Sequence, residues 1–278
     1  SAMIYRGMDV GTAKPDAELR RQAPHRLIDI LDPAESYSAA RFRGDALAAM
    51  GEIAAAGQVP LLVGGTMLYF SALQYGLSEL PPADAALRAA LDERAARDGW
   101  AALHAELARL DPAAARRIHI NDPQRIQRAL EVCYIAGRSM SELQAQGKVE
   151  APRYRYIKLA LAPPSRAQLH EIIEARFRSM MDRGFLDEVR RLRVRGDLHR
   201  GLPAMRAVGY RQLWEHLEGA CTLEEAVRRG IVATRRYAKR QLTWLRAEPE
   251  VTWFDAATPT LVEAACAFVA RQLADSGV

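Results

Sequence analysis

The stretch VPLLVGGTMLYFSALQYG, residues 59–76, decides the fold class of this chain. Its apolar first part ends in two glycines, as is typical of a buried strand in a parallel sheet. A helical pattern follows at once, beginning near Thr66. A strand that turns into a helix through glycines forms the usual ligand-binding edge of such a sheet. Residues 59–76 therefore predict an α/β protein.

The residues before this stretch extend the same pattern. PHRLIDIL, residues 24–31, predicts a short and partly buried strand. A helix is expected over 38–57, with Ser38 placed to cap its start and Gly57 to end it. The order strand, helix, strand, helix is that of a parallel sheet with helical crossovers.

The sequence from about Leu77 to Gly147 is rich in alanine and predicts helices rather than strands. Two helices with a break at Gly99 are expected first, and a third begins with Asp122 as N-cap and Pro123 in its first turn. APRYRYIKLALAP, residues 151–163, then predicts a return to the sheet. Further helices follow over 165–183, 185–195, 204–218 and 223–246, and VTWFD, residues 251–255, predicts a last strand before a carboxy-terminal helix.

Composition excludes several classes of protein. The chain of 278 residues has only short apolar runs, so we expect no membrane span. Its three scattered cysteines argue against a disulfide framework or a zinc site and favour a reducing, cytoplasmic setting. The net charge is +5, with arginine concentrated over 176–246. This pattern fits a polyanionic partner, or else an arginine-rich surface exposed to solvent.

The helix expected over 223–246 carries the strongest charge pattern. At 100° per residue one stripe is apolar, and two adjacent stripes hold the cations Arg228, Arg229, Arg235, Arg236, Lys239, Arg240 and Arg246. Like charges so close repel one another unless phosphates or carboxylates face them. Contact with RNA phosphates and a basic surface balanced by acids elsewhere both remain open.

Other candidate contacts are weaker when taken singly. Gly64 and Gly65 would let backbone N–H groups approach an anion, and Thr66 could offer its hydroxyl to a phosphate. Gln124, Arg125 and Arg128 belong to types that contact bases and phosphates. The GxxxxGK[ST], HExxH, GxSxG and GxGxxG motifs are all absent. The residues alone thus indicate an α/β protein with a helical insertion and a basic face that binds anions.

Six sequence blocks together resemble one family in their order along the chain. They are SAMIYRGMDVGTAKP, PHRLIDILDPAESYSAARFR, PLLVGGTMLYFSAL, NDPQRIQRALEV, GLPAMRAVGYRQLW and ATRRYAKRQLTWLR. The chain from Ser1 to about Asp255 resembles bacterial tRNA dimethylallyltransferases, which prenylate N6 of the adenosine just 3′ of the anticodon.

The resemblance implies a P-loop NTPase-like core with helices on both faces of a parallel sheet. That core would comprise residues 1–78 and 148–278, and a helical insertion domain over 79–147 would contact tRNA. The implied reaction is attack of adenine N6 on the allylic carbon of dimethylallyl diphosphate, with diphosphate released. The implied cofactor is Mg²⁺, and the implied partner is the anticodon stem-loop of tRNA, bound by a monomer.

Carried over by position, the resemblance also assigns residues. Thr66 would lie beside the reacting amine, and Arg176 would contact the diphosphate. The expected tRNA contacts are Ser1, Ala2, Met3, Arg88, Gln124, Arg125, Ile126, Gln127, Arg128, Arg206, Ala207, Val208, Gly209, Tyr210 and Arg211. On helical geometry we add Arg235, Lys239 and Arg246 as a tRNA phosphate track.

In this family a P-loop segment and a general-base Asp come directly before the position of Ser1. We therefore expect a chain that lacks its amino-terminal segment, including the metal-binding P-loop Thr, and that is catalytically inactive in this form. Three other functions stay open: an adenine-nucleotide isopentenyltransferase of the cytokinin type, a tRNA-binding module without catalysis, and a small-molecule P-loop kinase.

Overall fold

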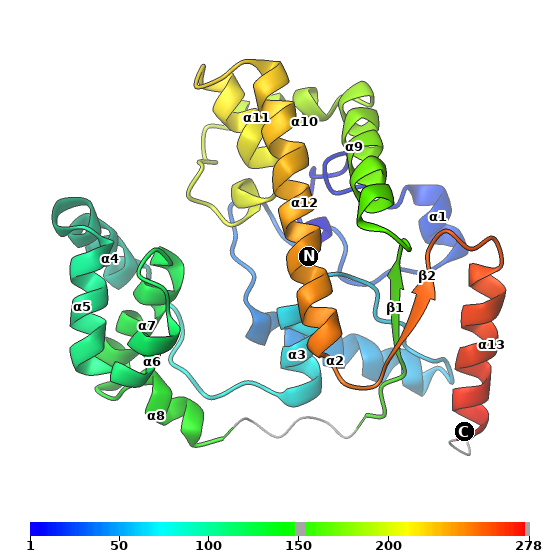
Figure 1. Cartoon of the computed structure of the whole chain (residues 1–278), viewed down its shortest axis with the longest axis horizontal. Helices are drawn as coiled ribbons and strands as arrows, with labels where there is room; N and C mark the ends of the chain where they lie inside the picture. The colour runs from blue at the N-terminus through cyan, green and yellow to red at the C-terminus, as the bar shows by residue number, and fades with distance from the viewer. Residues whose placement is uncertain (148–153, 276–278) are drawn as a thin grey trace. The chain divides into compact units, whose positions relative to one another are not determined.

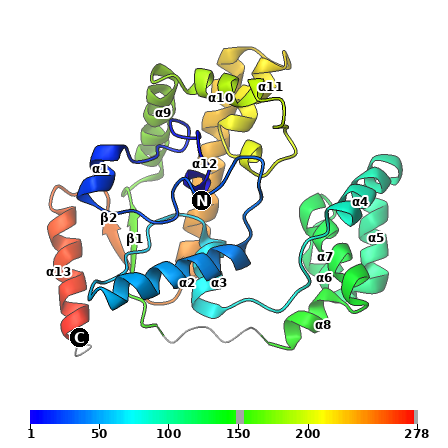
Figure 2. The same cartoon turned by 180° about the vertical axis from the view of Figure 1, so that it is seen from behind.

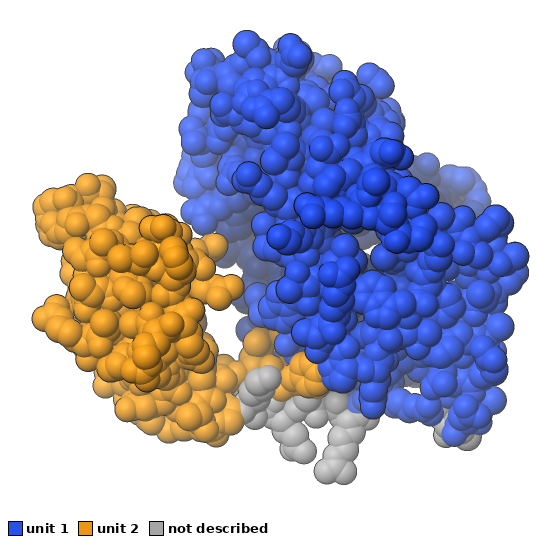
Figure 3. All heavy atoms as spheres, in the orientation of Figure 1, with its two compact units in different colours: residues 1–71, 154–278 blue, residues 72–153 orange. Residues whose placement is uncertain are grey.

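The computed structural model describes residues 1–147 and 154–275. The chain divides into two compact units. Unit 1 comprises Ser1–Ser71 and Tyr154–Val278, and unit 2 comprises Ala72–Arg153 (Figure 3). The sequence predicts the division after residue 78, whereas the two compact units divide after Ser71; the predicted second boundary at residue 148 lies outside the described residues.

Unit 1 is mainly helical and surrounds a small parallel sheet. Strands β1 (Lys158–Ala162) and β2 (Val251–Asp255) pair in parallel (Figures 1 and 2). In their register Lys158 lies opposite Val251 and Ala162 opposite Asp255. The elements before β1 are a 3₁₀ turn η1 (Ala2–Ile4), α1 (Ala17–Gln22), α2 (Ala39–Ala55) and the start of α3 (Met67–Tyr75). Those after it are α9 (Arg166–Asp182), α10 (Phe185–Val194), the 3₁₀ turn η2 (Ala204–Arg206), α11 (Tyr210–Leu217), α12 (Leu223–Ala247) and α13 (Leu261–Ala274).

The start of α2 lies at the cap expected from the sequence, and two other helices of unit 1 have caps of the same kind. The Ser38 hydroxyl accepts a hydrogen bond from the Arg41 N–H at the start of α2. Ser165 caps α9 and Thr222 caps α12 in the same way. Each cap satisfies an N–H group that has no partner inside its helix. Local sequence therefore determines where these helices begin.

Two of the expected strands are absent from the described residues. Residues 24–31 form only an isolated parallel bridge between Leu31 and Tyr5. Residues 59–63 form no ladder, and their alternate side chains are exposed: Val59 by 60%, Leu61 by 83% and Val63 by 85%. A strand needs a neighbour for its N–H and C=O groups, and no described segment pairs with residues 59–63. The expectation of a buried strand there was wrong for this structure.

The core of unit 1 lies where the chain's first residues meet α9–α12. Ile4, Met8 and Leu31 pack with Phe177 and Phe185, and all five are buried. The rings of Phe177 and Phe185 meet edge to face, with centroids 6.1 Å apart. The amino-terminal loop is therefore part of the hydrophobic core, and its backbone is held by packing as well as by hydrogen bonds.

Unit 2 is a separate helical cluster with its own apolar core. Its helices are α4 (Ala85–Asp98), α5 (Trp100–Leu110), α6 (Pro112–Arg117), α7 (Pro123–Ala136) and α8 (Met140–Ala145). As expected, Gly99 separates α4 from α5, and Asp122 caps α7 with Pro123 in its first turn. Leu103, Leu107, Ile126 and Leu130 are at most 1% exposed. An all-helical domain in this part of the chain agrees with the sequence pattern.

A buried carboxylate organises unit 2. Glu131 on α7 is 0% exposed and accepts hydrogen bonds from Arg88, Arg128 and the Asp84 N–H. Burial alone would raise the pKa of Glu131, but hydrogen bonds from the two arginines hold that pKa below its ordinary value of 4.5. Arg88 and Arg128, both expected to contact tRNA, are thus engaged inside the unit.

We expect Glu131→Gln to lower the free energy of unfolding of unit 2 by about 2 kcal/mol, because hydrogen bonds to a charged group are lost. The depressed pKa means that this contribution is present above the unfolded pKa and lost as the pH falls through the folded pKa. The gap between variant and wild type should therefore be constant above about pH 5 and shrink at lower pH. Urea unfolding with hydrogen exchange at the α7 amides measures both effects.

The matched control is Glu93→Gln, since Glu93 is an exposed carboxylate on α4. If Glu131→Gln and Glu93→Gln behave alike at neutral pH, the buried carboxylate does not hold this unit together.

Candidate functional site

The glycine–threonine turn and the chain's first residue meet in unit 1. The Thr66 hydroxyl donates a hydrogen bond to the Ser1 hydroxyl over 3.0 Å. The Gly65 carbonyl accepts hydrogen bonds from Gln241 Nε2 at 2.7 Å and from the Tyr237 hydroxyl at 3.3 Å. Two residues expected at the site, Thr66 and Ser1, are therefore in contact, and the turn that carries Thr66 is held against α12.

Sequence reasoning missed Gln241 and Tyr237. They lie four residues apart and therefore on one face of α12, which is the only signal that could have paired them. A Cβ built on Gly65 would lie 1.8 Å from Gln241 Nε2, so a larger residue at this position would displace the end of the Gln241 side chain. The glycine at position 65 thus permits a contact between the turn and α12.

A buried lysine organises the amino-terminal loop. The side chain of Lys14 is 2% exposed, and its Nζ donates to the Tyr5 carbonyl at 2.9 Å, to Asp9 at 2.6 Å and to Asp29 at 2.5 Å. Burial would raise the pKa of Asp29, but its hydrogen bonds to Lys14 and Arg20 lower that pKa overall. Asp29 is therefore a charged anchor for the loop.

Glu188 on α10 is the second anchor of the same loop and was also missed. It is 1% exposed and accepts hydrogen bonds from the backbone N–H groups of Asp9, Val10 and Gly11 at 2.8, 2.7 and 3.0 Å. It also accepts one from the Tyr210 hydroxyl at 2.5 Å. Three consecutive amides that point at one acidic side chain leave no periodic signal in the sequence.

Tyr210 and Ile126 are expected from the sequence to contact tRNA, but both side chains are buried in this structure. Tyr210 is 1% exposed, and burial together with Glu188 raises the pKa of its hydroxyl. Ile126 is 0% exposed in the core of unit 2. Both side chains are used for packing, because each faces the inside of its helix cluster. Their neighbours Arg211 and Arg125 are exposed.

The remaining expected contacts are distributed over both units. Gln124 is exposed in the first turn of α7, whereas Gln127 donates to Asp92 at 2.7 Å and to the Arg88 carbonyl. Arg176 is exposed on α9, and no described contact joins it to Thr66. Ala2, Met3, Ala207 and Val208 are half-buried, Gly209 is buried, and Arg206 is exposed.

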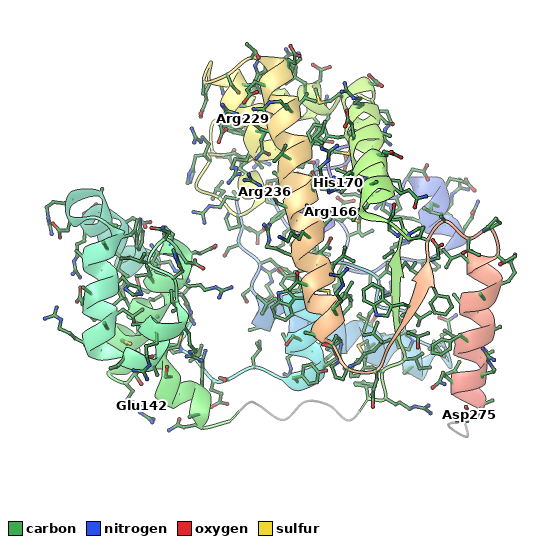
Figure 4. The ribbon with its side chains drawn as sticks, viewed as in Figure 1. Glu142, Arg166, His170, Arg229, Arg236 and Asp275 are labelled. Carbon is green, nitrogen blue, oxygen red and sulfur yellow. The ribbon has the colours of Figure 1, made fainter. Side chains whose placement is uncertain are left out.

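The expected phosphate track lines a cavity of about 640 Å³ between α9, α12 and the end of β2. Arg235, Lys239 and Arg246 come from α12, and Arg166 and His170 come from the facing side of α9 (Figure 4). Arg235 is paired with Glu174 at 2.9 Å. Lys239 and Arg246 are exposed and make no ion pair with any described residue. Their charge is therefore available to an anion.

Part of the positive charge of α12 is balanced within the helix. Glu225 accepts hydrogen bonds from Arg228 and Arg229, and these bonds lower the pKa of Glu225 to about 2. Arg236 (Figure 4), Lys239, Arg240 and Arg246 lie further along the helix and have no carboxylate partner among the described residues. The charge that can act on a ligand is thus concentrated in the second half of α12.

The described residues provide no metal centre of their own. No group of three or more His, Cys, Asp or Glu side chains is arranged to hold an ion in the described part of the chain. Mg²⁺ prefers oxygen ligands in octahedral geometry, and the turn offers only the Thr66 and Ser1 hydroxyls. These two hydroxyls do not make a complete Mg²⁺ site.

Unit 1 thus combines a glycine turn, the Thr66–Ser1 hydroxyl pair and a cationic cavity lined by α12, as in an α/β protein that binds anionic ligands. The family model described as IPP transferase matches residues 3–248. The chain belongs to the IPP transferase family.

Two curated relatives are both described as tRNA dimethylallyltransferase. The one from Alkalilimnicola ehrlichii is 62% identical over 252 residues, which are 91% of this chain and 79% of the relative. The one from Methylococcus capsulatus is 55% identical over 273 residues, or 98% and 88% of the two chains.

Solved structures agree on the fold. The full-length tRNA isopentenylpyrophosphate transferase from Bacillus halodurans is 37% identical with a TM-score of 0.70, and covers 100% of this chain and 87% of its own. A tRNA isopentenylpyrophosphate transferase from Staphylococcus epidermidis is 29% identical with a TM-score of 0.67, and the match covers 99% of this chain and 89% of that one. The prediction of an α/β protein is confirmed in part, because the described chain is mostly helical and contains a small parallel sheet.

The comparisons neither bear out the expected loss of an amino-terminal segment nor give any sign of the inactivity inferred from it. In the described part of the chain no helix is long and apolar enough to cross a membrane. The three cysteines, Cys133, Cys221 and Cys266, are unpaired.

Gly11→Ala should lower the free energy of unfolding of unit 1 by about 1–3 kcal/mol, because an added methyl in a filled site forces its neighbours apart. A Cβ at this position would lie 2.1 Å from Phe185 Cε2 and 2.6 Å from Tyr210 Cζ. Urea unfolding followed by circular dichroism measures the loss.

Gly44→Ala is the control, because no atom lies within 4 Å of its added Cβ and the residue is inside α2. It should be neutral or slightly stabilising. Equal losses in the two variants would contradict the tight packing of the loop against Phe185.

Proposed function

We propose that this chain transfers a dimethylallyl group from dimethylallyl diphosphate to N6 of the adenosine 3′ of the anticodon in tRNA. The observation that carries the proposal is 62% identity, over 91% of the chain, to a protein described as tRNA dimethylallyltransferase. The contact between Thr66 and Ser1 supports it, because both residues match positions that the family resemblance assigns to the reacting centre.

The reaction forms one C–N bond and breaks one C–O bond. Adenine N6 attacks the allylic carbon, diphosphate leaves with the bonding electrons, and N6 loses a proton. A carboxylate that accepts this proton would assist a weak nucleophile. Thr66, fixed by its turn and by α12, would orient the amine, and cations would offset the charge of the departing diphosphate.

The basic cavity supports a role for α12 in binding the RNA backbone. Lys239 and Arg246 have no carboxylate partner among the described residues, whereas Arg235 already faces Glu174. We assign Lys239 and Arg246 to phosphate contact and Arg235 to a shared role with Glu174. Arg166 and His170, on the opposite wall, extend the track. The exposed Gln124, Arg125, Arg206 and Arg211 are the further contacts proposed.

The finer parts of the proposal follow from the family. They are a P-loop NTPase-like core, a tRNA-contacting unit 2, a monomeric state and a cytoplasmic setting. Mg²⁺ would enter with the diphosphate of the donor, since Mg²⁺ is commonly held through substrate phosphates. When bound it would neutralise charge on the leaving group.

The decisive experiment uses two parallel reactions, each containing the protein, Mg²⁺ and labelled dimethylallyl diphosphate. One reaction contains an anticodon stem-loop RNA as acceptor, and the other contains AMP. We expect label in the RNA and none in AMP. Transfer to AMP alone would favour the cytokinin-type alternative. Tight RNA binding without transfer would favour a non-catalytic module.

Thr66→Val should lower kcat by about 10²-fold, the usual cost of losing one positioned hydrogen-bonding group at a reacting centre. The RNA Kd should be nearly unchanged, because the hydroxyl is not part of the cationic surface. Thr66→Ser keeps the hydroxyl and should retain most of the activity. Single-turnover transfer and filter binding give the two quantities, and an unchanged kcat in Thr66→Val would remove Thr66 from the site.

Lys239→Ala and Arg246→Ala should each weaken RNA binding and reduce the slope of log K against log salt by about one. Arg228→Ala is the matched control, because Arg228 lies on the same helix but faces Glu225. Binding titrations from about 50 to 200 mM salt provide the slopes. Slopes equal to the wild-type value in both test variants would contradict the phosphate track.

A further inference from the structure

Glu188 is a buried acid that makes no ion pair with any described residue. Its carboxylate is 1% exposed, and its partners are four neutral donors: the amides of Asp9, Val10 and Gly11, and the Tyr210 hydroxyl. A buried charge without a cation is costly unless hydrogen bonds replace its hydration. All four donors come from outside α10, so the charge is used to hold other segments in place.

These donors belong to two segments that are far apart in the sequence. Oε2 binds the Asp9 and Val10 amides, whereas Oε1 is shared by the Gly11 amide and the Tyr210 hydroxyl. Tyr210 is the first residue of α11 and directly follows the 206–209 segment. One oxygen atom therefore joins the amino-terminal loop to the start of α11.

Packing reinforces this junction. The rings of Phe185 and Tyr210 meet edge to face with centroids 4.9 Å apart, and Gly11 lies against both. Gly209 has a φ of +92°, a conformation that favours glycine, and its amide donates to Gln212 Oε1 at 2.8 Å. Aromatic contact therefore holds the two segments together in addition to the hydrogen bonds of Glu188.

The loop anchored by Glu188 also carries the Ser1–Met3 stretch. Met3 and Ile4 accept hydrogen bonds through their carbonyls from the Asp29 and Leu31 amides. Lys14 closes the loop by donating to the Tyr5 carbonyl. Residues 1–14 are therefore tied at one end to 29–31 and at the other to α10, with Thr66 in contact with Ser1.

We propose that Glu188 is a positioning residue for the transfer reaction. Its carboxylate sets the amino-terminal loop and the 206–211 segment in one fixed register, so that Ser1–Met3 and the exposed Arg206 and Arg211 meet the same target nucleotide together. The inference rests on the proposed function for its catalytic consequence, and on the four hydrogen bonds for its structural part.

The chemistry requires a carboxylate at position 188. A glutamine of the same shape keeps one acceptor oxygen but places an NH₂ donor against donors that already point at it. At least one amide or the Tyr210 hydroxyl then loses its partner. Charge-assisted hydrogen bonds are about twice as strong as neutral ones, so the remaining bonds are weaker as well.

The test compares Glu188→Gln with Asp187→Asn, its exposed neighbour on α10, which is 63% exposed and paired with Arg190. Both changes turn an acid into an amide on the same helical turn. Three quantities are measured on the full chain: kcat for transfer to an anticodon stem-loop RNA, the Kd for that RNA, and hydrogen exchange at the amides of Asp9, Val10 and Gly11.

In Glu188→Gln we expect exchange at the three amides to accelerate by at least about tenfold, as the loss of charge-assisted hydrogen bonds implies. We expect kcat to fall by about 10- to 100-fold, since a displacement near 1 Å can cost that much. The RNA Kd should stay within about threefold, because the exposed cations that dominate affinity are untouched. Asp187→Asn should match wild type in all three.

Tyr210→Phe provides a second and milder variant, for use if Glu188→Gln does not fold. It removes one of the four donors and should give an intermediate fall in kcat. Glu188→Asp keeps the charge but is one methylene shorter, and should recover part of the activity lost in Glu188→Gln.

Folded Glu188→Gln protein with wild-type kcat and wild-type exchange would overturn the proposal, as would a Tyr210→Phe variant identical to wild type. A loss of thermal stability with unchanged kcat per folded molecule would also overturn it, because Glu188 would then only stabilise the fold. A wild-type protein without transfer activity would contradict the proposed function, and amide exchange would still decide whether Glu188 holds the loop.

Discussion

The core of unit 1 depends on the carboxylate of Glu188, which is surrounded by three backbone amides and the Tyr210 hydroxyl. An unpaired charge inside a protein is stable only where donors replace water. The first residues of the chain supply these donors, and in doing so they become part of the core. The glycine turn, with Thr66 held against Ser1, lies at the other end of the same loop.

Unit 2 also contains a buried carboxylate that is stabilised by hydrogen-bond donors, but the donors are of a different kind. Glu131 is fully buried, but its donors are mainly two arginines that remain partly exposed. Arg88 and Arg128 therefore each connect a buried anchor to the surface of the unit. A role in organising the unit does not exclude a role at its surface, because a guanidinium has five N–H donors and Glu131 uses only some of them.

The cations of α12 fall into two groups, those paired with a carboxylate and those without such a partner among the described residues. Arg228 and Arg229 share Glu225, and Arg235 shares Glu174, so that their fields are largely cancelled locally. Lys239 and Arg246 border a cavity and have no such partner among the described residues. A count of positive charges along the helix overstates the surface available to a polyanion. Once the cations that are paired with carboxylates are set aside, the positive surface available to a polyanion is the second half of α12, beside Arg166 and His170.

The sequence by itself determined where helices begin, because caps such as Ser38, Thr222 and Asp122 act over a few residues. It also indicated the helical insertion, and the order of the six sequence blocks indicated the family. The pattern also located Thr66 and the cations of α12. Only the tertiary structure decided that residues 59–63 are exposed and that Ile126 and Tyr210 are buried, since strand pairing and burial depend on distant partners. It alone revealed Lys14, Gln241 and Glu188, whose roles come from groups up to 179 residues away. A buried acid and an exposed acid are the same letter in a sequence, and the difference arises from what folds around them.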